Sequence, residues 1–130
     1  MSVLDASTVV EVVINGPLAG SIRQTLAGLE DSFIAPHLID IEVMSALRRL
    51  AAEKRIESHR FEAFRASLEM FPLVRYSPTP LLLRIWELRH NFTCYDATYI
   101  ALAEATDSTL YTCDAKLKKG HRARVIVFTG

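Results

Sequence analysis

The chain has 130 residues, of which 50% are hydrophobic and 23% charged, and its formal net charge at pH 7 is zero. This length suits one domain, residues 1–130, that can bury a sizeable core. The balanced charge argues against a general nucleic-acid coat protein, and no apolar run is long enough to cross a membrane. We therefore expect a cytoplasmic protein without membrane contact.

Short apolar runs alternate with longer segments of helical periodicity. In chain order we expect a strand at residues 2–5, a helix at 18–29, a strand at 33–35, helices at 36–55 and 58–70, a strand at 73–76, helices at 79–89 and 95–106, and strands at 109–113 and 124–128. Pro36 and Pro80 suit the first turns of their helices, and Thr79 suits a cap. This alternation predicts an α/β fold whose parallel sheet is covered on both faces.

Four carboxylates lie next to apolar segments, where an acidic residue is unexpected without a structural or functional role. Asp5 and Asp114 each end an expected strand, and ligand sites of parallel sheets form beyond the carboxyl ends of the strands. Asp96 opens an apolar helix, and Glu42 borders the core face of another. If the fold brings these acids together, the site must bind divalent cations or hold protons. The pattern therefore predicts metal-dependent phosphodiester chemistry.

Each acid also has a purely structural interpretation. Asp5 and Asp114 suit turns after strands, and Asp96 suits a helix N-cap. Asp40 lies at the opposite edge of the helix face from Glu42, near the helix start, where the helix dipole favours an acid. Helical geometry alone does not decide between Asp40 and Glu42.

Four motifs follow one another along the chain. They are VLDAS at residues 3–7, Pro36 with EVMSALRR at 42–49, LRHN at 88–91 with YDATYIALA at 95–103, and TCDAKL at 112–117. In these motifs the chain resembles the PIN-domain ribonuclease toxins of the VapC family, which belong to VapBC toxin–antitoxin systems. The resemblance implies a PIN-like three-layer α/β/α sandwich with a central, mostly parallel sheet of four to five strands.

The resemblance also implies a site and an activity. The acids that it assigns as catalytic residues and metal ligands are Asp5, Glu42, Asp96 and Asp114, with Ser7 and Thr112 as supporting hydroxyl residues. The implied cofactor is one or two Mg²⁺ or Mn²⁺ ions. The implied protein is an endoribonuclease toxin in which metal-activated water hydrolyses RNA, leaving a 5′-phosphate and a 3′-hydroxyl. The implied partners are a VapB-like antitoxin and a second copy of the chain in a homodimer.

Two groups of basic residues are candidates for binding RNA near the acids. The first is an acid-free stretch that follows Asp114 and contains Lys116, Lys118, Lys119, Arg122 and Arg124. The second is the pair Arg48 and Arg49, one to two helical turns beyond Glu42. Such cations could hold phosphates that flank the scissile bond, and a solvated basic turn is the alternative interpretation.

Two apolar clusters are either core or interface. One contains Leu81–Leu83, Ile85 and Trp86, and the other contains Phe61, Phe64, Leu68 and Phe71. Core packing is the simpler interpretation, and a dimer interface or an antitoxin groove is the functional one. The competing functional hypothesis is a catalytically silent PIN-like module that binds nucleic acid or protein. Loss of an acidic position would indicate such a module, and all four positions are acidic.

Overall fold

The computed structural model describes residues 1–130 and is built on a five-stranded sheet. The strands are β1 (Ser2–Leu4), β2 (Phe33–Pro36), β3 (Leu73–Tyr76), β4 (Thr109–Thr112) and β5 (Arg124–Val127). They lie in the order β3-β2-β1-β4-β5, and every neighbouring pair is parallel. The short apolar runs of the sequence form strands because helices cover the sheet and bury them on both faces.

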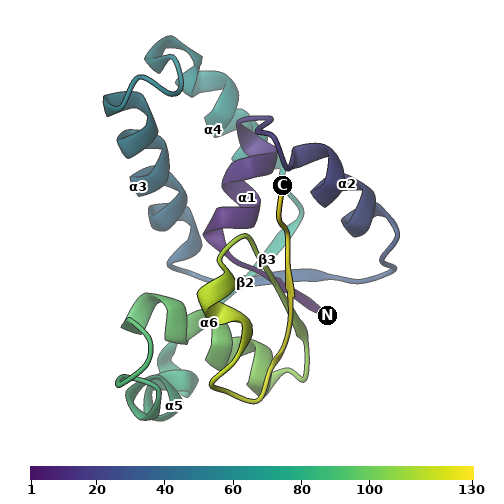
Figure 1. Cartoon of the computed structure of the whole chain (residues 1–130), viewed down its shortest axis with the longest axis vertical. Helices are drawn as coiled ribbons and strands as arrows, with labels where there is room; N and C mark the ends of the chain where they lie inside the picture. The colour runs from purple at the N-terminus through teal and green to yellow at the C-terminus, as the bar shows by residue number, and fades with distance from the viewer.

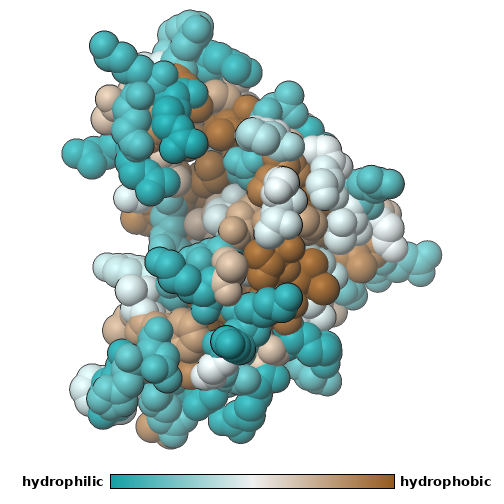
Figure 2. Space-filling model, in the orientation of Figure 1, coloured by the Kyte–Doolittle hydropathy of each residue, from teal (hydrophilic) through white to brown (hydrophobic).

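Helices form a layer on each face of the sheet (Figure 1), which confirms the predicted three-layer α/β/α sandwich. One layer contains α1 (Ala6–Val13), α2 (Ala19–Ala27), α3 (Ile39–Ala52) and α4 (Phe61–Met70), and the other contains α5 (Leu82–Glu87) and α6 (Cys94–Ala105). Short 3-10 helices are η1 (Ser58–Arg60), η2 (Thr79–Leu81) and η3 (Ala115–Lys118). Helices α3 and α4 form an arm that projects from the sheet, and hydrophilic residues cover its outer surface (Figure 2).

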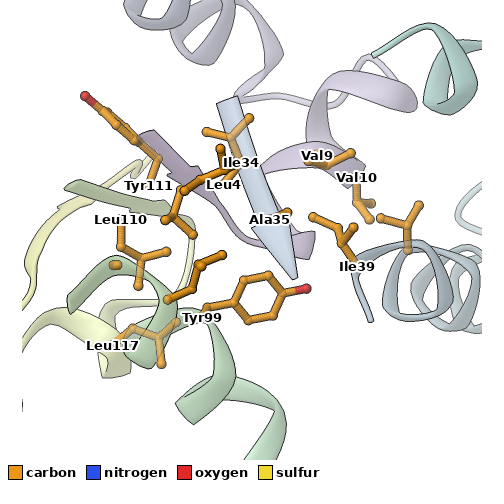
Figure 3. Packing of buried hydrophobic residues seen from close by; sticks show 14 of the residues in the cluster. Leu4, Val9, Val10, Ile34, Ala35, Ile39, Tyr99, Leu110, Tyr111 and Leu117 are labelled. Atoms are coloured by element: carbon orange, nitrogen blue, oxygen red, sulfur yellow. The ribbon is translucent and has the colours of Figure 1, made fainter. Parts of the chain in front are cut away.

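The core lies on both sides of the central strands (Figure 3). Leu4, Ile34 and Leu110 from β1, β2 and β4 pack among side chains of α1 and α6, which include Val9 and Tyr99. Each of these five residues is at most 2% exposed, and burying a large apolar side chain contributes roughly 1.5–3 kcal/mol. This core fixes the elements from which the functional side chains extend.

Helix α6 is the most deeply buried helix of the fold. Every residue from 97 to 103 is buried, because the helix packs against β1, β2 and β4 on one side and α5 on another. Alanines at positions 97, 101 and 103 allow the helix to approach the sheet closely. The first turn of α6, which carries Asp96, is therefore held rigidly beside the sheet.

Three helices end in the same way, on a residue with a left-handed backbone. The residues are Asn15 after α1 (φ 55°), Lys54 after α3 (φ 57°) and Asp107 after α6 (φ 49°). After α3, the Arg55 N–H donates to the Leu50 carbonyl at 2.9 Å, which closes a Schellman motif. The direction in which the chain leaves α3 is thus fixed by backbone hydrogen bonds.

Three expectations about local structure were wrong. Helix α1 was not predicted at all. Pro36 does not start a helix but is the last residue of β2, and α3 begins at Ile39. This position tolerates proline because β1 pairs with β2 only as far as Ile34, beyond which no neighbour on that side needs its N–H. Thr79 does not cap α5, since residues 79–81 form a 3-10 turn and α5 begins at Leu82.

None of the helices has both the length and the apolar character that a membrane crossing needs.

Candidate metal-binding active site

An open cleft of about 1520 Å³ lies where β1 and β4 end. The sheet order reverses at this point, because the chain moves from β1 to β2 in one direction and later returns to place β4 on the other side of β1. Such switch points are the usual ligand sites of parallel sheets. The cleft is lined by all four acids singled out in the sequence: Asp5, Glu42, Asp96 and Asp114.

Asp5 is the most buried of the four acids and is held by three donors. It is the N-cap of α1, and its Oδ1 accepts hydrogen bonds from the Thr8 N–H at 3.1 Å and the Ser7 hydroxyl at 2.7 Å. Its Oδ2 accepts a hydrogen bond from the Thr112 hydroxyl at 2.6 Å. Asp5 therefore ends a strand, as predicted, but it does so by starting a helix rather than by forming a simple turn.

The two hydroxyl residues connect β1 and β4 across the site. The Ser7 hydroxyl accepts a hydrogen bond from the Cys113 N–H at 2.9 Å, and the Thr112 hydroxyl accepts one from the Asp114 N–H at 3.0 Å. Each hydroxyl thus donates to Asp5 and accepts from the chain that leads into Asp114. Ser7, which also lines the cleft, and Thr112, which does not, fix the relative positions of two of the acids.

The structure separates Glu42 from Asp40. Asp40 is held away from the cleft by Arg75 on β3, whose Nε and Nη2 donate to its two carboxylate oxygens at 2.7 and 2.8 Å. Glu42 is half-buried and lines the cleft. Asp40 therefore has a structural partner, and Glu42 faces the other acids.

Asp96 and Asp114 arrive from two further elements. The N-cap of α6 is Thr93, whose hydroxyl oxygen accepts from the Asp96 N–H at 3.1 Å, so the capping interpretation of Asp96 was wrong. Asp114 is the N-cap of η3, where its Oδ1 accepts from the Lys116 N–H at 3.0 Å. Asp114 thus combines a structural role with a place in the cleft.

Burial and mutual repulsion govern the ionisation of these acids. Burial raises the pKa of Asp5, although the hydrogen bonds from Thr112, Ser7 and Thr8 oppose the shift. Burial also raises the pKa of Glu42; the nearby Tyr99 hydroxyl opposes this shift, although its geometry falls short of a hydrogen bond, and the charges of Asp96 and Asp5 add to it. For Asp96, burial and the charge of Asp114 raise the pKa, while Thr93 and Lys116 lower it. Without a cation, the site disfavours its own full ionisation.

Tyr99 adds a buried hydroxyl to this site. Its ring points from α6 toward the end of β2 and Ile39 (Figure 3), and its Oη has no hydrogen-bond partner of acceptable geometry. Burial raises the pKa of Tyr99 far above its usual value, and the nearby charge of Glu42 adds to the shift, so the hydroxyl keeps its proton. The sequence analysis did not identify this residue, although it lies one turn beyond Asp96 on the same helix face.

The donor set fits a hard divalent cation. No three acidic, histidine or cysteine side chains lie close enough together to form a complete ligand cluster. Mg²⁺ does not need one, because it keeps several water ligands and binds proteins through one or two carboxylates together with substrate phosphate. The carboxylates of Asp5, Glu42, Asp96 and Asp114 would offer a cation oxygen ligands only, and a bound cation would relieve their repulsion.

The predicted basic residues divide into two groups. Lys116, Lys118, Lys119 and Arg122 do not line the cleft, although Lys116 lies near enough to Asp96 to lower its pKa. Arg122 and Arg124 instead border a second depression of about 540 Å³, where the Arg122 N–H donates to Glu104 at 2.7 Å.

The second group, Arg48 and Arg49, does line the cleft, and Arg55 and Arg60 join them there. The sequence analysis did not single out Arg55 and Arg60. Their position just after the helix that carries Glu42 was the available signal.

The two predicted apolar clusters also differ. Phe64 and Leu68 are buried in the core. Leu81 at the end of η2 and Ile85 on α5 are buried, but Leu82, Leu83 and Trp86 on α5 are 58%, 74% and 62% exposed.

Comparison with known proteins shows which family has this sequence and fold. A family model described as the PIN domain matches residues 2–122. The chain is 41% identical over 121 residues to ribonuclease VapC1 of Mycobacterium tuberculosis, with 88% of this chain and 86% of the relative covered. It is 36% identical over 124 residues to ribonuclease VapC9 of the same organism, with 95% and 94% covered.

Solved structures show the same fold. The sarcin–ricin loop cleaving toxin VapC20 of Mycobacterium tuberculosis superposes with a TM-score of 0.71 at 17% identity, covering 91% of this chain and 93% of that one. PAE2754 from Pyrobaculum aerophilum superposes with a TM-score of 0.68 at 23% identity, covering 95% and 89%. From its sequence motifs, its fold and these matches, the chain belongs to the PIN-domain family and, within that family, to the VapC proteins.

Proposed function

We propose that this protein is an endoribonuclease toxin of a type II toxin–antitoxin system that hydrolyses RNA phosphodiester bonds with the help of Mg²⁺ or Mn²⁺. The observation that carries the proposal is that four carboxylates from separate parts of the chain line one cleft at the switch point of the sheet. The VapC relatives are named as ribonucleases, which favours RNA as the substrate.

Each acid has a role in metal binding that follows from its position. Asp5, fixed by Thr112, Ser7 and Thr8, provides the most rigid oxygen ligands, and Glu42 and Asp96 provide ligands from the two flanking helices. A bound divalent cation would lower the pKa of a water molecule and stabilise the charge that develops on the phosphate. The site needs several carboxylates because a phosphodiester is anionic, so cations must first neutralise the protein's own acids.

Partners follow from the same assignment. A VapC protein is expected to bind RNA as its substrate and a VapB-like antitoxin as its inhibitor. We also propose a homodimer that buries the exposed apolar side chains of Leu82, Leu83 and Trp86 on α5. Sedimentation velocity tests the dimer: Leu83→Glu should yield monomers, and an unchanged sedimentation coefficient would place the interface elsewhere.

Cleavage of a structured RNA tests the activity. The reaction should require Mg²⁺ or Mn²⁺, stop in EDTA and fall by at least about 100-fold in Asp96→Asn, in line with the loss of one strong electrostatic contribution to catalysis. Asp40→Asn is the matched control, because Asp40 is an acid of α3 that pairs with Arg75 outside the cleft. Cleavage that survives both EDTA and Asp96→Asn would exclude this site. RNA binding without cleavage in either metal would instead identify a silent binding module.

A further inference from the structure

The charges that line the cleft are segregated. The four acids gather where β1 and β4 end, whereas four arginines line the part formed by α3 and the turn toward α4. We name these arginines the arginine wall; they are Arg48, Arg49, Arg55 and Arg60. In Figure 2 the α3–α4 arm is predominantly hydrophilic and overhangs a hollow beside the body of the molecule.

The side chains of the four wall arginines and of Arg122 make no hydrogen bond or ion pair within the protein, and of these five only the wall arginines line the cleft. The side chains of six other arginines donate hydrogen bonds within the protein; they are Arg23, Arg65, Arg75, Arg84, Arg89 and Arg124. The four guanidinium groups of the wall are exposed, and none of them makes an ion pair or a hydrogen bond to another side chain. Their charge is therefore available to an anion that enters the cleft.

The backbone sets the positions of these side chains. Glu42 and Arg49 are seven residues apart, so they lie on the same face of α3 at a separation of about 10 Å along the helix axis. The small residues Ser45 and Ala46 lie between them on that face and also line the cleft. A helical face with an acid at one end, a cation at the other and a shallow floor between them can accommodate an extended strand.

Two further members of the wall are fixed beyond the end of α3. The Schellman motif at Lys54 directs the chain so that Arg55 lines the cleft. The Arg60 guanidinium lies over the ring of Phe64, 5.1 Å from its centroid, which limits its motion without neutralising its charge. The wall therefore extends the positive surface away from the acids in one direction.

We propose that the arginine wall holds the backbone of a single-stranded RNA segment on one side of the scissile phosphate, and that the stretch of residues 116–122 does not. This inference rests on the proposed ribonuclease function. Unpaired arginines suit phosphate groups because each guanidinium can donate two parallel hydrogen bonds. Exposed Tyr95 lines the same cleft beside Asp96 and offers a ring on which an unpaired base can stack, which a duplex does not present.

The test measures binding and not cleavage. A fluorescent single-stranded RNA of about 12 nucleotides is titrated by anisotropy at several salt concentrations, in an Asp96→Asn background that cannot cut it. The triple variant Arg49→Gln, Arg55→Gln, Arg60→Gln should reduce the slope of log K against log salt by about 2, because each single-strand phosphate contact contributes about 0.7. Each single substitution should reduce the slope by about 0.7. The single variants therefore provide the test if the triple variant folds poorly.

The matched control removes the same number of charges from a basic stretch that does not line the cleft. Lys116→Gln, Lys118→Gln, Lys119→Gln should leave the slope within error of the parent protein. The inference is overturned if the salt dependence of RNA binding falls in the lysine variant but not in the arginine variant. It is also overturned if neither variant changes the slope of log K against log salt.

Two other outcomes are distinct from these. Loss of antitoxin binding with unchanged RNA binding in the arginine variant would assign the wall to an acidic segment of the protein partner and overturn the inference. The proposed function itself fails only if acid-dependent RNA cleavage is absent, which is measured separately with the unmodified chain.

Discussion

The Thr112 hydroxyl donates a 2.6 Å hydrogen bond to the Asp5 carboxylate and so joins two residues that are 107 positions apart in the chain. Both residues are buried, and Thr112 also accepts from the Asp114 N–H. This contact links the end of β1 to the end of β4, and it is one of the hydrogen bonds that lower the pKa of Asp5 against the effect of burial.

Replacing Thr112 with valine should destabilise the protein and impair the site. Valine keeps the shape of threonine but leaves the Asp5 Oδ2 without its donor and the Asp114 N–H without its acceptor, at a cost of roughly 1–3 kcal/mol in the free energy of unfolding. Urea denaturation in EDTA measures the change. Thr109→Val at the other end of β4 is the control and should cost less, since the Thr109 hydroxyl makes only an exposed 3.4 Å contact with Arg124.

Thr93→Ala should lower metal-free stability, whereas Asp96→Asn should not. Thr93 caps α6, so its replacement should lower the free energy of unfolding by about 1 kcal/mol. Asp96 is disfavoured as an anion by burial and by Asp114, so its neutralisation should cause no loss. Thermal unfolding in EDTA compares the two variants. A lower melting temperature for Asp96→Asn than for Thr93→Ala would contradict the assignment of the cap to Thr93.

Mg²⁺ should stabilise the unmodified chain and have little effect on Asp96→Asn. A ligand that binds only the folded state adds about 2.7 kcal/mol at one hundred times its dissociation constant. The melting temperature is therefore followed as MgCl₂ is added to each protein, with an equal ionic strength of NaCl as the control. Equal shifts for both proteins would show that the metal binds elsewhere.

The metal-free protein should lose stability at this site as the pH rises. Asp5, Glu42 and Asp96 have pKa values raised above 3.8, 4.5 and 3.8, so the folded state binds their protons more tightly than the unfolded state does. The free energy of unfolding contributed by these groups is therefore largest below those values and falls as the pH rises through the raised values. The difference between the unmodified chain and Glu42→Gln, measured in EDTA from pH 4 upward, isolates the contribution of Glu42.

Tyr99→Phe should leave metal-free stability unchanged or raise it by about 1 kcal/mol, because it removes a buried hydroxyl that has no hydrogen-bond partner. Chemical denaturation in EDTA provides the measurement. A loss of more than about 1 kcal/mol would mean that the hydroxyl donates to Glu42 in solution, since a hydrogen bond to a charged group contributes roughly that much or more.

The sequence predicted the sheet well because its strands are short apolar runs between helical segments. It did not predict α1, since Val9, Val10, Val12 and Val13 are β-branched residues with low helix propensity. Tertiary packing against α2, α3 and β4 overrides that propensity. A signal was nevertheless present, because aspartate is a favoured N-cap residue, and in the structure Asp5 caps α1 by accepting from the Thr8 N–H.

The acidic residues of the site could be predicted from the sequence, but the residues that surround them could not. Helical geometry alone did not decide between Glu42 and Asp40, and the resemblance to the VapC family favoured Glu42. In the structure the residue that distinguishes them is Arg75, which lies 35 positions from Asp40 and meets it only in the folded sheet. The position of Arg55 depends instead on the local backbone hydrogen bonds that end α3. Neither the long-range contact of Arg75 nor this helix end leaves a periodic pattern for sequence analysis to detect.

The pairing of β1 with β4 has a consequence for the time at which the site forms during synthesis. Asp5 is synthesised 107 positions before Thr112, so its Oδ2 has no donor until Thr112 is made and β4 takes its place beside β1. A nascent chain that ends before β4 therefore holds neither a complete hydrogen-bond shell around Asp5 nor the fourth acid. An incomplete chain of this kind therefore lacks the arrangement of acids on which the proposed cleavage depends.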